Sequence, residues 1–210
     1  MNKTAEIVNR WVEFESRHPE ATIHDFYRYE LIKEREGKKS FTFLGGVIPP
    51  KADQILVKIL DRIIKIHRVY NQNLLRNIGI GGMDEFLYLN NVQHLENLRK
   101  IDIINTNFNE LSSGLLIIER LIKKGLLVEM PDPNDKRSKL MELTDLGKEK
   151  LNACYCALNK LNEVIFNHLE EDELSLCIQI LKPIETKFSS LCILDKKLDF
   201  EEVYNRELNS

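Results

Sequence analysis

The side chains of this sequence best placed for chemistry lie in a short polar segment between two segments of strand character. Residues 126–130 and 139–143 have the two-residue periodicity of paired strands. The segment between them holds Asp135, Lys136 and Arg137 beside two prolines, which predicts an exposed turn. Lys136 and Arg137 would place cations at the tip of this hairpin, where they could bind phosphates. Asp135 could hold the Arg137 guanidinium by a charge-assisted hydrogen bond.

The sequence lacks the usual patterns of catalysis and metal binding. The four cysteines, Cys154, Cys156, Cys177 and Cys192, include no pair with the C-x-x-C spacing of a zinc or redox site. Residues 79–83 are rich in glycine, but they follow a predicted helix and lack the G-x-G-x-x-G order of a phosphate loop, which predicts a turn. We therefore expect no catalytic residue, metal or cofactor, and a protein that is not an enzyme.

A helix, a tight turn and a second helix precede the predicted hairpin. The short helix covers about residues 100–105, the turn 107–110, and the second helix 112–124. Gly125 is expected to end this helix, because glycine adopts a left-handed backbone at little cost. A helix-turn-helix followed by a hairpin predicts a winged helix, whose second helix fits the DNA major groove. The inward positions of this helix should be Ile117, Ile118, Leu121 and Ile122.

Long helices are predicted on both sides of this region. Their apolar stripes at 56–74 and 151–165 are longer than one small core needs, so part of that surface should face a second copy of the chain. The expected fold is mainly α, a winged helix-turn-helix flanked by dimerisation helices. The expected order is a helical extension and linker (1–50), a dimerisation helix (51–78), the winged helix (79–147), C-terminal dimerisation helices (148–192) and an acidic tail (193–210).

The segment 120–147 resembles the multiple-antibiotic-resistance regulator (MarR) family. That family has a leucine in the recognition helix, then Gly-Leu, a D-x-R wing tip, and Leu-Thr-x-x-Gly at the start of the next helix. The resemblance implies a homodimeric, mostly helical DNA-binding repressor whose first and last helices form the dimer interface. Such a repressor would bind a palindromic DNA site, and a small ligand could modulate this binding. The matching residues are Leu121, Gly125, Leu126, Asp135, Arg137, Leu143, Thr144 and Gly147.

The recognition helix departs from the family pattern. Family members usually present small polar and basic residues early in this helix, whereas this sequence has Leu115 and Leu116, both expected to face outward. A leucine can touch a thymine methyl group but cannot donate to guanine, so the polar residues would mostly contact phosphates. An alternative interpretation is a winged-helix protein-interaction module with lost or weak DNA readout. The candidate DNA contacts are Ser112, Ser113, Leu116, Arg120, Lys123, Asp135, Lys136 and Arg137.

Three ring side chains could line a ligand cavity between the dimerisation and DNA-binding parts. His67 and Tyr70 lie on the long helix 52–77, and Tyr88 lies on the next helix. A core or interface role remains open for each of them. The ligand that the family resemblance suggests is small and amphipathic or aromatic.

The composition is that of a globular chain, with 43% hydrophobic and 30% charged residues and a net charge of −3. An acidic balance means that a DNA-binding face would have to arise from local arrangement of charge. The first dozen residues are polar and charged, unlike a signal peptide, and no apolar run is long enough to span a membrane. We expect a cytoplasmic protein with reduced thiols.

Overall fold

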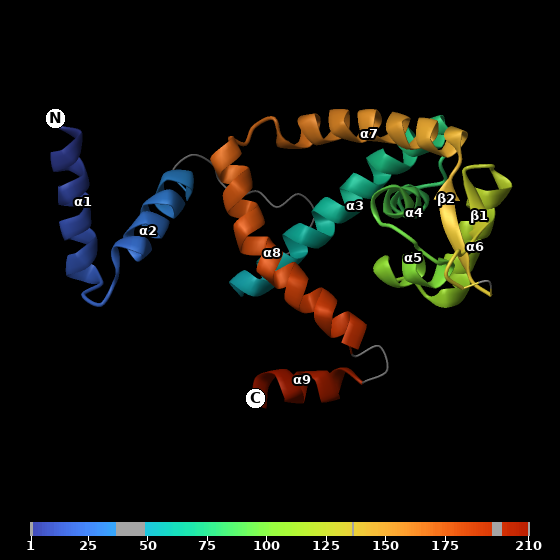
Figure 1. Ribbon diagram of the computed structural model, residues 1–210. Coiled ribbons are helices and arrows are strands. Elements are labelled where there is room, and N and C mark those ends of the chain that lie inside the picture. Colours follow the sequence, from blue (N-terminus) through green and yellow to red (C-terminus); the bar gives the residue numbers. More distant parts are fainter. Residues whose placement is uncertain (1, 37–48, 136, 195–198, 210) are drawn as a thin grey trace. The chain divides into compact units, whose positions relative to one another are not determined.

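The computed structural model describes residues 2–36, 49–135, 137–194 and 199–209 (Figure 1). The chain divides into two compact units, Met1–Val57 and Lys58–Ser210. The elements are α1 (Lys3–Arg17), α2 (Ile23–Glu36), α3 (Ala52–Ile78), α4 (Met83–His94), α5 (Lys100–Thr106), α6 (Leu111–Lys123), β1 (Leu127–Pro131), β2 (Lys139–Leu143), α7 (Asp145–Phe166), α8 (Glu171–Leu194) and α9 (Phe200–Asn209).

In the first unit, α1 and α2 pack through aromatic side chains. Phe14 and Phe26 are buried, and the Trp11 ring meets the Phe26 ring edge-on with centroids 5.3 Å apart. Arg10 Nη1 donates to Glu30 Oε2 at 2.8 Å, which adds a polar link between the two helices. Edge-to-face ring pairs stabilise such a small core beyond the area they bury.

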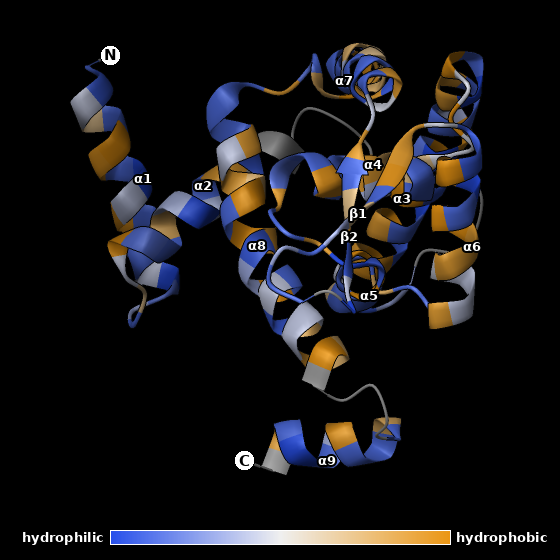
Figure 2. Ribbon diagram, turned by 45° about the vertical axis from the view of Figure 1, so that its right-hand side comes forward, coloured by the Kyte–Doolittle hydropathy of each residue, from blue (hydrophilic) through white to orange (hydrophobic). Residues whose placement is uncertain are grey.

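The core of the second unit lies where α4, α5, α6 and α7 meet the two strands. Buried side chains come from each of these elements, together with Leu75 of α3. Hydrophobic and hydrophilic residues alternate along these helices (Figure 2), and hydrophobic residues of each of them are buried in the core. The fully or nearly fully buried members include Leu75, Tyr88, Leu89, Ile103, Ile104, Ile118, Leu121, Leu127, Leu151 and Cys154.

The two strands form an antiparallel hairpin. Leu127 lies opposite Leu143 and Met130 lies opposite Leu140. Leu127 and Leu140 are buried and anchor the hairpin on the core. The hairpin is joined to the segment after α4 as well, because the Met141 N–H donates to the Leu98 carbonyl at 2.8 Å. The strands therefore hold turn residues 132–135 clear of the core.

The predicted fold class, mainly α with a two-stranded wing, is confirmed. The glycine-rich segment is a turn between α3 and α4, as expected, and Gly125 ends α6 with φ +71°. Helix α6 begins at Leu111, one residue before the predicted start, with Glu110 as its N-cap, and residues 200–209 of the acidic tail form a helix.

Within the described ranges, none of the helices is long and apolar enough to cross a membrane.

Candidate DNA-binding surface

Helix α6 presents a mostly polar outer face that also exposes two leucines, Leu111 and Leu116. Gly114, Ile117, Ile118 and Leu121 are buried, so the opposite side of the helix faces solvent. Leu116 is 57% exposed. The prediction for Leu115 is wrong, because its side chain is half-buried and packs on the core. The exposed positions of the helix are Leu111, Ser112, Ser113, Leu116, Glu119, Arg120 and Lys123.

A buried carboxylate at the start of α4 holds the C-terminal end of α6. The Glu85 side chain is only 4% exposed and accepts from Lys124 Nζ at 2.7 Å and from Arg120 Nε at 3.3 Å. Its Oε2 atom also accepts from the Gly81 backbone N–H at 2.6 Å. We call Glu85, Arg120, Lys124 and Gly81 the Glu85 clamp. It fixes the orientation of α6 relative to α4. Arg120 is half-exposed, but its guanidinium is held by this ion pair with Glu85.

Ionisation of Glu85 is favoured despite its burial. Burial alone would raise the pKa of this carboxyl, because a charge loses solvation in the protein interior. The hydrogen bond and charge of Lys124, the Gly81 N–H and the Arg120 guanidinium outweigh this effect and lower the pKa below its ordinary value. The clamp is therefore a charged contact under neutral conditions.

The hairpin tip exposes a guanidinium. The Arg137 side chain is 92% exposed, and Arg137 Nε lies 3.3 Å from Asp135 Oδ1. The same Asp135 oxygen accepts the Arg137 backbone N–H at 3.0 Å, so the carboxylate fixes both the turn and the arginine. This geometry is the one expected from the D-x-R spacing. Lys136, the other predicted cation of the tip, lies outside the described residues.

The base of the wing is less available to an anion than the tip. Glu129 on β1 pairs with Lys100 of α5 and with Lys139 of β2, the latter at 2.5 Å. These contacts lower the pKa of the Glu129 carboxyl, chiefly through the Lys100 hydrogen bond. The two lysines are thus partly neutralised, whereas the Arg137 guanidinium extends into solvent beside Asp135.

The Leu-Thr-x-x-Gly segment joins the wing to α7. Thr144 Oγ1 donates to the Gly125 carbonyl at 2.6 Å and accepts the Gly147 N–H at 2.9 Å, so Thr144 is the N-cap of α7. A Cβ atom at Gly147 would lie 2.1 Å from the Leu126 carbonyl oxygen. The helix can approach the backbone this closely only because residue 147 is glycine. This junction fixes the wing relative to α6 and α7.

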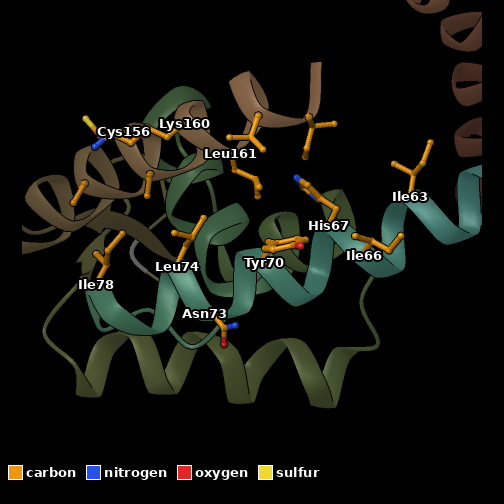
Figure 3. A pocket seen from close by; sticks show the side chains of 14 residues that line it. Ile63, Ile66, His67, Tyr70, Asn73, Leu74, Ile78, Cys156, Lys160 and Leu161 are labelled. Carbon is orange, nitrogen blue, oxygen red and sulfur yellow. The ribbon is translucent and has the colours of Figure 1, made fainter. Parts of the chain in front are cut away.

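An apolar cavity of about 900 Å³ lies between α3 and α7. His67 and Tyr70 line it from α3, and Cys156, Lys160 and Leu161 line it from α7 (Figure 3). Lys160 and Cys156 were not predicted from the sequence, because nothing local to α7 shows which of its sides faces α3.

The third predicted pocket residue lies elsewhere. Tyr88 does not line this cavity: it is fully buried in the winged-helix core, and its hydroxyl donates to Asn109 Oδ1 at 3.0 Å. Burial, with a smaller contribution from Asp84, raises the pKa of Tyr88 to about 12. Tyr88 is therefore a core residue.

The four cysteines form no disulfide. Burial raises the pKa of the Cys154 thiol to about 11, which disfavours the reactive thiolate. Among the described residues, no cluster of histidine, cysteine and acidic side chains could hold a metal ion.

Comparisons with known proteins agree with this geometry. Residues 82–147 match the winged helix DNA-binding domain family. A search of curated proteins finds no match. Solved structures of the same fold include three whose names state a binding partner or a function.

The first is a mutant of MarR from E. coli complexed with operator DNA, 21% identical, covering 61% of this chain and 92% of that chain with a TM-score of 0.56. The second is CouR from Rhodococcus jostii RHA1 bound to p-coumaroyl-CoA. It is 17% identical, and the match covers 65% of this chain and 95% of the CouR chain with a TM-score of 0.57. The third is a probable transcriptional regulator from Pseudomonas aeruginosa. It is 21% identical, and the match covers 64% of this chain and 99% of that chain with a TM-score of 0.55.

Each of these matches covers nearly two thirds of this chain and more than nine tenths of the matched chain. The resemblance found in the sequence is thereby confirmed at the level of the fold: the chain contains a winged helix DNA-binding domain and has the fold of the MarR-family transcriptional regulators.

Proposed function

We propose that this chain is a cytoplasmic, homodimeric regulator that represses transcription by binding a palindromic DNA site, with no catalytic role. The observation that carries the proposal is that one winged helix combines a solvent-exposed recognition helix with an exposed wing arginine. The Arg137 side chain of the wing is 92% exposed and is held by Asp135. A helix of this kind fits the major groove, and an arginine beside it suits the negative potential of a narrow minor groove. The E. coli MarR structure of the same fold is complexed with operator DNA.

Selection of genomic fragments on the full-length protein tests this function. A two-fold protein binds a two-fold site, so the recovered fragments should share a palindrome with half-sites about one helical turn apart. Enrichment no better than random sequence would contradict DNA recognition and favour the protein-interaction module, for which the exposed Leu116 would then be the natural contact.

Exposed apolar side chains on the long helices support the dimer. Leu56, Ile63 and Ile66 on α3 are each at least 40% exposed, as are Ile178 and Phe188 on α8. Large apolar groups left in water on several helices are typical of a surface that another chain covers. Sedimentation at micromolar concentration should give a dimer, and a stable monomer would contradict this part of the proposal.

The cavity between α3 and α7 supports control by a small amphipathic or aromatic ligand. Its walls are mostly apolar, with Tyr70 and His67 on one side and Lys160 able to pair with an acidic group. The CouR structure of the same fold holds an aromatic thioester ligand, p-coumaroyl-CoA. A ligand that prefers one spacing of the two recognition helices would change DNA affinity by selecting that state.

Thermal-shift measurements with phenolic acids test this ligand class. We expect at least one compound to raise the unfolding temperature of the wild type and to lose this effect in Tyr70→Ala, with Tyr88→Phe as the control outside the cavity. A shift that leaves DNA affinity unchanged would contradict ligand control.

A further inference from the structure

The outer ridge of α6 is built from Ser112, Leu116, Glu119 and Lys123, one residue per turn on the side opposite the core. Leu116 lies near the middle of this ridge and is 57% exposed. In a recognition helix the ridge is the part that enters the major groove. Leu116 is therefore the ridge side chain best placed to meet base edges directly.

The first two turns of α6 carry no arginine or lysine that could contact guanine, and the ridge lysine, Lys123, lies about two turns beyond Leu116. Guanine presents only acceptors, O6 and N7, in the major groove, and arginine or lysine contacts both of them. Residues 111–118 contain no arginine, lysine, asparagine or glutamine. Arg120, the arginine of this helix, lies one turn further on and is paired with the buried Glu85 at 3.3 Å.

The carboxylate that follows Leu116 on the ridge also disfavours guanine. Glu119 is exposed, and a carboxylate can accept from the amino group of cytosine or adenine but not from the acceptor edge of guanine. Leu116 and Glu119 thus combine an apolar contact with an acceptor, which is the complement of a thymine methyl group beside an amino group.

We propose that Leu116 is a specificity-determining residue that contacts the 5-methyl group of a thymine, so that each half-site carries thymine at the base pair that Leu116 covers. This assignment rests on the DNA-binding function proposed above. A protein partner fits the ridge less well, because the ridge neighbours of Leu116 are serine, glutamate and lysine, and an apolar docking site needs a contiguous patch.

Replacement of thymine by deoxyuridine tests the contact, because it removes the methyl group and leaves base pairing intact. The probe is a duplex selected from a random library by the full-length wild-type protein. Each thymine is replaced in turn, and affinity is measured for the wild type, Leu116→Ala and Leu116→Met. Thymines under the wing serve as the matched control on the DNA.

We expect the wild type to lose about fourfold in affinity at one base pair of each half-site, the factor that corresponds to one buried methyl group. Leu116→Met should keep this discrimination, and Leu116→Ala should bind the thymine and uracil duplexes equally. Because Leu116 is exposed, its alanine variant should unfold at the wild-type temperature.

Two results would overturn the inference while leaving DNA binding intact: equal wild-type affinity for thymine and uracil at every position, or undiminished discrimination in Leu116→Ala. Failure to select any duplex over the random pool would instead contradict the proposed function itself.

Discussion

At the wing tip, the Arg137 side chain extends almost wholly into solvent and is oriented by Asp135. On the recognition helix, by contrast, Arg120 is paired with the buried Glu85, and Leu116 lies on the exposed outer face. The wing therefore presents an exposed arginine, and the recognition helix offers Lys123 at its C-terminal end together with the apolar contact of Leu116. Charge acts on phosphates irrespective of sequence, while contact with base edges distinguishes one base pair from another. The two regions should thus divide affinity and specificity between them.

Both regions depend on the junction at Gly147, so its loss should have the largest effect. In Gly147→Ala the new Cβ would lie 2.1 Å from the Leu126 carbonyl oxygen, which forces α7 away from the wing. We expect a loss of about 3 kcal/mol in the free energy of unfolding and loss of DNA binding. Urea unfolding of the variant checks this. Leu146→Ala, a change at the exposed neighbouring position, should be nearly neutral; equal stability of both variants would contradict the close approach.

The Glu85 clamp should contribute less, and mainly to the recognition helix. Glu85→Gln removes the charge that holds Lys124 and Arg120, and we expect it to cost about 2 kcal/mol of stability at neutral pH. Thermal unfolding measures this. Glu119→Gln, on the outer ridge of α6, is the matched control and should change stability little.

The same clamp predicts a pH dependence with a definite sign. The pKa of Glu85 in the folded protein is lower than its ordinary value of 4.5. The stabilisation is therefore fully present above that ordinary value and is lost as the pH falls through the lower, folded pKa. Wild-type stability should decrease over this acidic window more steeply than that of Glu85→Gln. Parallel stability curves would show that Glu85 is not the titrating group.

The sequence was sufficient to predict the winged helix because its signals are local. Apolar periodicity, the Thr144 cap and the D-x-R turn each depend on residues a few positions apart. The Glu85 clamp joins residues 35 and 39 positions apart, and no local pattern marks a glutamate as buried. For the same reason Tyr88 was assigned to a pocket, although its hydroxyl is bound to Asn109 in the core.

The smallest effect is expected at Asp135. Asp135→Ala leaves the Arg137 charge in place but removes the carboxylate that orients its guanidinium and turn N–H. DNA affinity should fall by only about threefold, less than in Arg137→Ala, because the arginine can still reach a phosphate after losing conformational order. Fluorescence anisotropy with the selected duplex can resolve this difference. A larger loss than in Arg137→Ala would mean that Asp135 contacts DNA itself.

We assign phosphate contacts to the wing and base contacts to the recognition helix. The most direct test is the salt dependence of DNA binding in the wild type, Arg137→Ala and Leu116→Ala. The slope of log affinity against log salt counts the phosphate charges neutralised. Arg137→Ala should weaken binding about tenfold and reduce the magnitude of the slope by about one per wing. Leu116→Ala should weaken binding but keep the wild-type slope, so that its plot of log affinity against log salt runs parallel to that of the wild type. An unchanged affinity and slope in Arg137→Ala, or a changed slope in Leu116→Ala, would contradict the assignment of charge to the wing and of base contact to the recognition helix.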